Sequence, residues 1–377
     1  MASALRVLGG SYRSKLGESP VWTDDGRLAF VDIVAKRLLF LDPSAADAPP
    51  VSVPLPTAPG CVVRSAKGGL LVALAVDDTA PKMRGGRLVR VHPPPPRGSG
   101  GAAASEDDDS SSSLVSVARE SSACDVLNAN IHPMLSEETS PAMVLNDGAV
   151  DARGRVWVGC KLLAPAPADA DATSPGALFC CEAAVAFRDG AAVAVGSAQV
   201  VPEVGGVHTS NGIGWSPDGK TMYHVDSPKR RVDAYDFDAR SGMLRDKRVF
   251  ASVGSRPNEA KGDSVDSVPD GLCVDVEGGV WVCVWGAGEI VRFVPDAKDG
   301  GAGVRDRVVR TPCSRPTSCC FGGGDAATRR MLFVTSCSLD DTVDAGATSV
   351  SVEEPDAGAV FAVDVGVEGV EVHAAAF

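Results

Sequence analysis

Short alternating runs of apolar residues, each preceded by a turn that contains glycine, recur six times along the chain. After each run and a gap comes a second apolar run, which in several copies ends near an Asp. Five copies start at Thr23, Ser65, Asp151, Ser216 and Asp275, and a degraded sixth surrounds Arg330–Val334. Because glycine supplies the positive φ of a tight turn and period-two alternation is typical of strands, each copy predicts a β-hairpin.

The regularity of the repeat predicts how these hairpins are assembled. One such hairpin cannot bury its own apolar faces, so the units must stack on one another. Radial stacking closes a ring and leaves only short edges, which predicts an all-β, six-bladed β-propeller with a central channel. A two-sheet sandwich is the competing all-β fold, but it would not need so regular a repeat. We interpret residues 1–377 as a single domain.

Two low-complexity segments interrupt the repeat. Residues 97–140 include an acidic run followed by serines, and we expect this insert to be partly disordered. Residues 164–175, rich in Ala and Pro, form a loop insert within the third blade. We interpret the second insert as an expanded turn, with a lid over the channel as the alternative.

Composition limits the binding partners and the cellular compartment that we expect for this protein. A formal net charge of −13 leaves no basic stripe to neutralise phosphates, so nucleic acid is not an expected partner. No run of about 18 apolar residues exists, and the first residues lack the apolar core of a signal peptide, so no membrane association is expected. The 11 cysteines, an odd number scattered over predicted strands, suit small core residues in a reduced, cytoplasmic protein. We expect a monomer.

Four polar residues occur at corresponding offsets before four of the blade turns: Glu18, Asn146, Asn211 and Asp270. Equivalent positions in successive blades should point at the same place on the axis. Two carboxylates and two amides give an all-oxygen set, which hard divalent cations prefer. Asn-Gly and Asp-Gly pairs are also common turn residues, but here a downstream glycine already supplies each turn. The pattern therefore predicts a metal site in the channel.

Several motifs together resemble the regucalcin / gluconolactonase (senescence-marker-protein) family. They are Gly17–Pro20, Asn146–Gly148, Ser210–Gly212, Pro269–Gly271 and Gly279–Val282. The resemblance runs from about Glu18 to the C-terminus and is interrupted by the two inserts. It implies a six-bladed propeller that holds one divalent cation on its axis and hydrolyses a lactone.

By this resemblance, Glu18, Asn211 and Asp270 would be the protein ligands of one divalent cation, Ca²⁺, Zn²⁺, Mn²⁺ or Mg²⁺. Asn146 would lie beside the metal and contact the substrate. Asp270 would also be the catalytic general base that deprotonates water, while the metal polarises the lactone carbonyl. The implied activity is that of a metal-dependent lactonase, a carboxylic ester hydrolase, and the implied partner is a small-molecule lactone.

Two departures from the family pattern bear on the substrate. Val144 stands where the enzymes that act on sugar lactones carry Arg, and 160–163 (Cys-Lys-Leu-Leu) replaces a segment with an acidic residue. These changes indicate a less polar substrate. A non-catalytic, calcium-binding regulatory propeller is the first alternative, and a closed metal site or a pocket filled by Leu162 and Leu163 would favour it. A propeller hydrolase of organophosphate-type esters is the second.

Further polar residues receive structural interpretations. His208 is interpreted as a loop histidine satisfied by the backbone, with a proton shuttle as the alternative. Asp147 and Asp151 are expected to stabilise turns. Asp32 and Asp226 end apolar strands, where either a place in the pocket or a role as strand-end hydrogen-bond acceptors fits.

Overall fold

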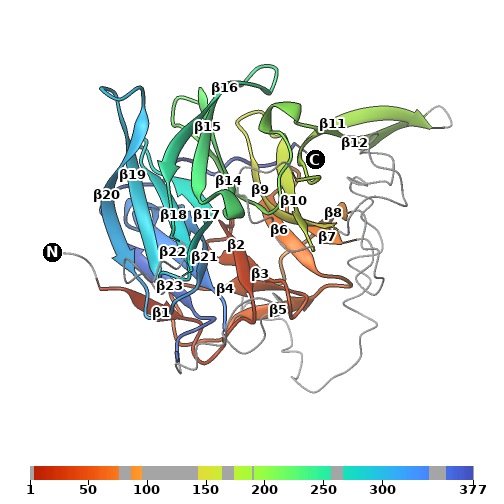
Figure 1. Cartoon of the computed structure of the whole chain (residues 1–377). Coiled ribbons are helices and arrows are strands. Elements are labelled where there is room, and N and C mark those ends of the chain that lie inside the picture. Colours follow the sequence, from red (N-terminus) through yellow and green to blue (C-terminus); the bar gives the residue numbers. More distant parts are fainter. Residues whose placement is uncertain are drawn as a thin grey trace.

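Six antiparallel sheets follow one another in chain order around a ring, as the succession of colours in Figure 1 shows. Five sheets contain four strands and one contains three. The prediction of a six-bladed β-propeller is therefore confirmed. This computed structural model describes residues 4–75, 86–95, 143–163, 174–188, 191–255, 266–338 and 354–376. The 97–140 insert and residues 164–173 of the second insert lie outside the described residues.

The strands of the first three blades run outward from the axis in chain order: β2 (Gly17–Trp22), β3 (Leu28–Asp32), β4 (Arg37–Leu41) and β5 (Val51–Pro54); then β6 (Pro59–Arg64), β7 (Leu70–Ala75) and β8 (Gly86–Val91); then β9 (Met143–Val150), β10 (Val156–Leu162), β11 (Leu178–Arg188) and β12 (Ala191–Val200). The fourth and fifth blades are β13 (Ser210–Trp215), β14 (Thr221–Asp226), β15 (Arg231–Asp238) and β16 (Met243–Ser252); then β17 (Val268–Val274), β18 (Val280–Trp285), β19 (Glu289–Asp296) and β20 (Ala302–Arg310).

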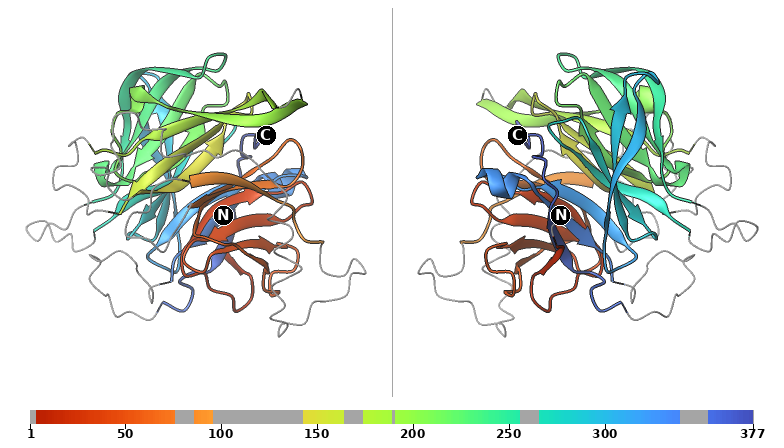
Figure 2. Two further views of the ribbon diagram at one scale, coloured as in Figure 1. Left: turned by 90° about the vertical axis from the view of Figure 1, so that its right-hand side faces the viewer. Right: turned by 90° about the vertical axis from the view of Figure 1, so that its left-hand side faces the viewer.

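The sixth blade joins the two ends of the chain. It consists of β21 (Pro316–Phe321), β22 (Met331–Ser336), β23 (Val360–Asp364) and, outermost, β1 (Arg6–Leu8). β1 pairs antiparallel with β23, and Figure 2 shows the N-terminal red strands beside the C-terminal blue ones. The inner strands β2, β6, β9, β13, β17 and β21 contact one another in succession, and β21 contacts β2. The ring is therefore closed.

Helical pieces are short in the part of the chain that the structure describes. They are η1 (Pro202–Val204), η2 (Ser227–Lys229) and α2 (Ala326–Arg329). None of the described helices has the length and apolar character needed to span a membrane.

Apolar side chains fill the seams between blades. Trp157 of the third blade packs edge-on against Trp215 of the fourth, with ring centroids 6.0 Å apart, and against Phe237 at 5.8 Å. Of the ten described cysteines, all are free thiols and eight are buried, in agreement with the expectation that they act as small core residues. The core is thus a set of inter-blade layers that surround the axis.

The C-terminal segment after β23 crosses one end of the ring. Backbone N–H groups of Val370, Ala375 and Ala376 donate to carbonyl groups of the fifth, second and third blades, at Val274, Arg64 and Gly154, over 2.8–3.1 Å. These bonds tie three blade turns together in addition to the β1–β23 closure.

A buried aspartate organises the first turn of two blades. Asp275 is fully buried and accepts hydrogen bonds from the Trp281 indole at 2.8 Å and from Arg292 Nε at 2.7 Å. Asp151 repeats this arrangement in the third blade, where the Trp157 indole donates to it at 2.9 Å. The interpretation of Asp151 as a turn-stabilising residue is supported by these contacts. Each such carboxylate fixes a turn and a core tryptophan together.

The substitution Asp275→Ala should lower the free energy of unfolding by about 3 kcal/mol, because it leaves the buried Arg292 charge and the Trp281 indole N–H without this acceptor. Urea-induced unfolding measures the change. Asp218→Ala removes an exposed aspartate from the equivalent turn of the fourth blade, and its effect should stay within about 0.5 kcal/mol. Equal unfolding midpoints for the two variants would contradict this account of the turn.

Candidate active site

Every inner strand departs from regular pairing at one place. The register of all six shifts there, as between Ser210 and Ile213 of β13 and between Pro269 and Leu272 of β17. Such a bulge adds one residue to a strand and redirects its side chains. The bulges therefore give the channel wall a ring of equivalent positions, one on each blade.

These positions can be identified by counting back from the blade turns. A backbone N–H closes the first turn of each blade, at Thr23, Ser65, Asp151, Ser216, Asp275 and Gly322. Five residues before them stand Glu18, Gly60, Asn146, Asn211, Asp270 and Thr317. The four candidate residues thus occupy four equivalent positions of the ring, and the second and sixth blades contribute a glycine and a threonine.

Two of the candidates are in direct contact. Asn146 Nδ2 donates to Asn211 Oδ1 at 2.9 Å and to the Ser210 carbonyl at 2.8 Å. Asn211 Nδ2 in turn donates to Ser227 Oγ at 2.7 Å. These bonds fix the orientation of both amides. Asn211 Oδ1 keeps a second lone pair, and Asn146, with both amide protons engaged, keeps only its oxygen for another molecule.

The carboxylates of Glu18 and Asp270 repel each other across the channel. Burial raises the pKa of Glu18 well above its usual value, and the charges of Asp270 and Asp147 raise it further. Burial also raises the pKa of Asp147 to about 6. Like charges held close in a protein interior favour protonation or a bound cation. The channel therefore concentrates negative charge at the level of the bulges.

The interpretation of Asp147 as a residue that stabilises a turn is wrong. Asp147 lies within strand β9, where the Gly148 N–H donates to Asp147 Oδ1 at 2.8 Å. Its charge acts on Glu18. Asp147 occupies the bulge directly after Asn146, so it belongs to the channel wall rather than to a turn.

The oxygen donors of the channel suit a hard divalent cation. Two carboxylates and one oriented amide oxygen, from Glu18, Asp270 and Asn211, are the groups that Ca²⁺, Mg²⁺ and Mn²⁺ prefer. No group of three or more His, Cys, Asp or Glu residues within the described ranges is arranged to hold a metal ion. The proposed ligand set therefore contains only two acidic residues, Glu18 and Asp270, and needs the amide oxygen of Asn211 as its third ligand.

A supporting layer behind the amides was not predicted from the sequence. His224 Nε2 lies 2.9 Å from Ser210 Oγ, and Ser227 holds the Asn211 amide. Burial lowers the pKa of His224 to about 4, so its ring is neutral near pH 7. His224 lies within the second strand of the fourth blade and Ser227 directly follows that strand. Only their closeness to Asp226 in sequence could have drawn attention to them.

Hydrogen bonds explain the structural roles of Asp226, Asp32 and His208. Asp226 accepts from the backbone N–H groups of His208 and Thr209, the latter at 2.9 Å. Asp32 accepts from Lys15 N–H at 2.9 Å and Ala35 N–H at 3.0 Å. Both aspartates are thus strand-end acceptors. His208 is buried in a loop, as expected, but the contact of its Nδ1, at 2.7 Å, is with the side-chain hydroxyl of Thr209 and not with the backbone.

The residues that depart from the family pattern lie on, or directly after, the paired strands β9 and β10 of the third blade. Val144 pairs with Lys161 in the β9–β10 ladder, and Lys161 also bridges to Thr209. The positive charge of Lys161 lowers the pKa of Glu18, whereas the charges of Asp270 and Asp147 raise it. Leu162 is buried, whereas 45% of Leu163 is exposed. Leu163 therefore faces solvent and does not fill a pocket.

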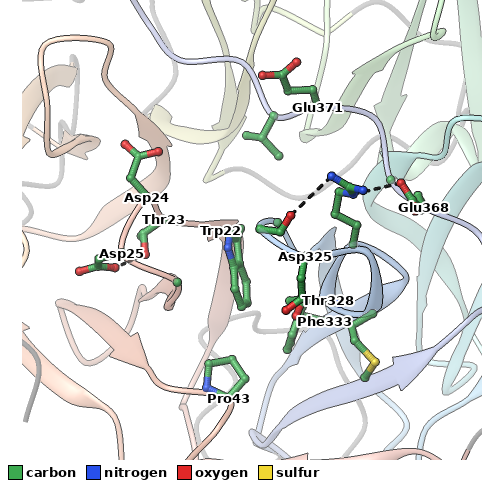
Figure 3. Close-up of a pocket in the computed structure, with 18 of the residues that line it drawn as sticks. Trp22, Thr23, Asp24, Asp25, Pro43, Asp325, Thr328, Phe333, Glu368 and Glu371 are labelled. Carbon is green, nitrogen blue, oxygen red and sulfur yellow. Dashed lines mark hydrogen bonds and ion pairs between the residues drawn. The ribbon is translucent and has the colours of Figure 1, made fainter.

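A groove of about 1200 Å³ lies elsewhere, between the first and sixth blades. Figure 3 shows Trp22 and Phe333 in it, surrounded by acidic side chains such as Asp325 and Glu368. None of the four candidate residues lines it. Glu18 and Trp22 belong to the same strand, near its opposite ends, so the groove is separate from the site at the bulges.

Comparison with known proteins identifies relatives along most of the chain. Residues 16–338 match the family model described as the SMP-30/Gluconolactonase/LRE-like region. Regucalcin of Gallus gallus is 28% identical over 363 residues, which cover 96% of this chain and 95% of the relative. Regucalcin of Xenopus laevis is 28% identical over 323 residues, covering 85% and 83%.

Solved structures share the fold at lower identity. A luciferin-regenerating enzyme aligns with a TM-score of 0.64 at 23% identity, over 98% of this chain and 99% of the other. A calcium-binding protein, regucalcin, from Agrobacterium tumefaciens gives 0.61 at 22%, over 99% and 97%. A gluconolactonase from Xanthomonas campestris gives 0.53 at 18%, over 96% and 89%.

The neutral His224 predicts acid sensitivity. Its pKa of about 4 in the folded state is below the value of about 6.5 in an unfolded chain, so stability is lost as the pH falls from about 6.5 towards 4. Between pH 7 and pH 5 the wild type should lose about 2 kcal/mol more unfolding free energy than His224→Gln. Urea titrations at both pH values measure this.

The matched control for that experiment is His373→Gln, which changes an exposed histidine and should keep the wild-type dependence on pH. If His224→Gln loses as much stability as the wild type on acidification, the buried histidine is not the acid-sensitive group.

Proposed function

This chain belongs to the SMP-30/gluconolactonase/LRE-like family, and we propose that it is a divalent-metal-dependent hydrolase of a lactone. One observation carries the proposal. Two repelling carboxylates, of Glu18 and Asp270, and the oriented amide oxygen of Asn211 lie at equivalent positions of the inner strands. The family supplies the reaction class, and these residues supply the donors that such a reaction needs.

Glu18, Asn211 and Asp270 are the proposed ligands of the cation. A divalent ion would offset the two carboxylate charges, whose repulsion raises the pKa of Glu18. Asn211 would bind through Oδ1, because its Nδ2 is held by Ser227. Oxygen donors favour Ca²⁺, Mg²⁺ and Mn²⁺, and Zn²⁺ is the remaining ion to test.

The proposed reaction is addition of water to the lactone carbonyl. A cation bound in the channel would polarise this carbonyl and stabilise negative charge on its oxygen. Asp270 is the proposed general base and accepts a proton from the attacking water. The ring C–O ester bond then breaks, and the released oxygen takes up a proton to give a hydroxy acid. A lactone is already an ester, so no covalent nucleophile on the protein is needed.

Asn146 is the proposed substrate contact. Both of its amide protons are engaged by Ser210 and Asn211, so only Oδ1 remains to accept a hydrogen bond from the substrate. Val144, two residues before Asn146 on the same strand, is aliphatic. We therefore propose a lactone with few hydroxyl groups, one of which donates to Asn146.

The proposal predicts hydrolysis that depends on an added cation. Protein stripped of metal should be inactive and should regain activity with one of Ca²⁺, Mg²⁺, Mn²⁺ or Zn²⁺, followed by a pH indicator on a panel of sugar and aliphatic lactones. Asp270→Ala should lower kcat/KM by about 10²–10⁴-fold because it removes the base and a ligand. Aliphatic lactones should be preferred over those rich in hydroxyl groups.

The matched control is Asp299→Ala, which removes an exposed carboxylate from the outer part of the same blade and should leave kcat/KM unchanged. Hydrolysis that persists without metal or in Asp270→Ala would contradict the proposal. Tight binding of Ca²⁺ with no turnover of any lactone or phosphate ester would instead favour a non-catalytic, calcium-binding propeller.

A further inference from the structure

Three thiols meet at the seam between the fifth and sixth blades, outside the proposed active site. Cys273 Sγ and Cys319 Sγ are 3.5 Å apart, and Cys283 also shares a hydrogen bond with Cys319. Cys283 and Cys319 are buried, whereas Cys273 is partly exposed. The cluster therefore combines a close pair of sulfur atoms with one that solvent can reach.

The backbone brings these residues together because two inner strands approach closely. Cys273 lies on β17 and Cys319 on the neighbouring β21. A Cβ atom added to Gly271 would clash with Ser318 Oγ and lie 2.6 Å from Ser318 Cα, so the lack of a side chain at Gly271 lets Ser318 of β21 pack directly against β17. This closest approach comes two residues before Cys273 and one residue before Cys319.

We propose that Cys273 and Cys319 form a reversible disulfide across this seam when a hydroperoxide is present. A disulfide has an S–S distance of about 2.05 Å, so the two sulfur atoms must approach by about 1.5 Å, which rotation about the side-chain bonds can supply. The proposal concerns the thiols alone and does not depend on the proposed lactonase activity.

The chemistry balances with one peroxide. The Cys319 sulfur attacks a peroxide oxygen, the O–O bond breaks, and Cys319 becomes a sulfenic acid as one water leaves. The Cys273 sulfur then attacks the sulfenic sulfur, the S–S bond forms, the S–O bond breaks, and a second water leaves with the remaining thiol proton. Two thiols are oxidised by two electrons, and one hydrogen peroxide is reduced to two waters. A dithiol reverses the bond by thiol–disulfide exchange.

The local environment supports Cys319 as the attacking sulfur. Hydrogen bonds from the thiols of Cys273 and Cys283 lower the pKa of Cys319, although its burial acts in the opposite direction. The thiolate is the nucleophilic form of cysteine. The two thiol donors thus prepare the Cys319 sulfur for attack on the peroxide, whereas burial and the hydrogen bond to Cys319 raise the pKa of Cys273.

The position of the pair links its redox state to the channel wall. Cys273 follows Asp270 by three residues on β17, and Cys283 stands opposite the bulge of that strand, between the pairs Pro269–Val284 and Leu272–Val282. A bond from Cys273 to Cys319 would tie the strand that carries Asp270 covalently to β21. Oxidation would therefore restrain one side of the channel.

Mass spectrometry of the full-length protein tests the bond. After exposure to hydrogen peroxide and blocking of free thiols, digestion with trypsin and an enzyme that cuts after Glu277 separates Cys273 from Cys283. A cross-linked pair containing Cys273 and Cys319 is expected, and dithiothreitol should remove it. Cys273→Ser should abolish the cross-link. Cys180→Ser, which changes the other partly exposed cysteine, and Cys320→Ser should retain it.

Differential alkylation of the wild type gives a readout that does not depend on how a variant folds. Cys273 and Cys319 should lose reactivity towards the blocking reagent together as peroxide is added. A cross-link from Cys319 to Cys283 would overturn the assignment. So would the absence of any cross-link at peroxide concentrations that oxidise Cys180.

Discussion

Pairing of β1 with β23 closes the ring, and the rest of the channel depends on that closure. Only in a closed ring do six inner strands face one axis, so that residues far apart in sequence share one environment. The bulge in each inner strand then places one residue per blade at the same level. Glu18 and Asp270 are far apart in the sequence, yet the charge of Asp270 raises the pKa of Glu18, and both charges raise the pKa of the Cys337 thiol. The C-terminal segment reinforces the arrangement by joining three blade turns.

The convergence of the inner strands brings carboxyl groups of like charge close together, which is unfavourable. Burial and neighbouring negative charges raise the pKa of Glu18 and Asp147, so the charged forms of these carboxyl groups are disfavoured. A bound cation would stabilise them. Lys161 opposes this charge only in part, as the direction of the Glu18 shift shows. In a blade turn, by contrast, the buried carboxylate of Asp275 is paired with Arg292 at 2.7 Å. The channel differs from this blade turn because burial and neighbouring negative charges raise the pKa of Glu18, which makes the channel a candidate for cation binding.

Much of the fold could be predicted from the sequence because its signals are local. Glycine turns and alternating apolar runs predicted six blades, and the constant offset from those turns predicted that Glu18, Asn146, Asn211 and Asp270 are equivalent. Contacts between blades were not predictable in this way. The Ser227 and His224 layer, the Cys273–Cys319 pair and the groove near Trp22 all join segments whose pairing is set by inter-blade packing or by the second strand of a blade. Asp147 was misinterpreted because an Asp-Gly pair is typical of turns, whereas here it lies in a bulge.

Anomalous diffraction from crystals grown with Mn²⁺ locates a bound cation without reference to turnover. One strong peak is expected on the channel axis, bonded to oxygens of Glu18, Asn211 and Asp270, and it should be lost in Asp270→Ala. A peak in the acidic groove beside Asp325 and Glu368, with none in the channel, would show that the channel is not the cation site.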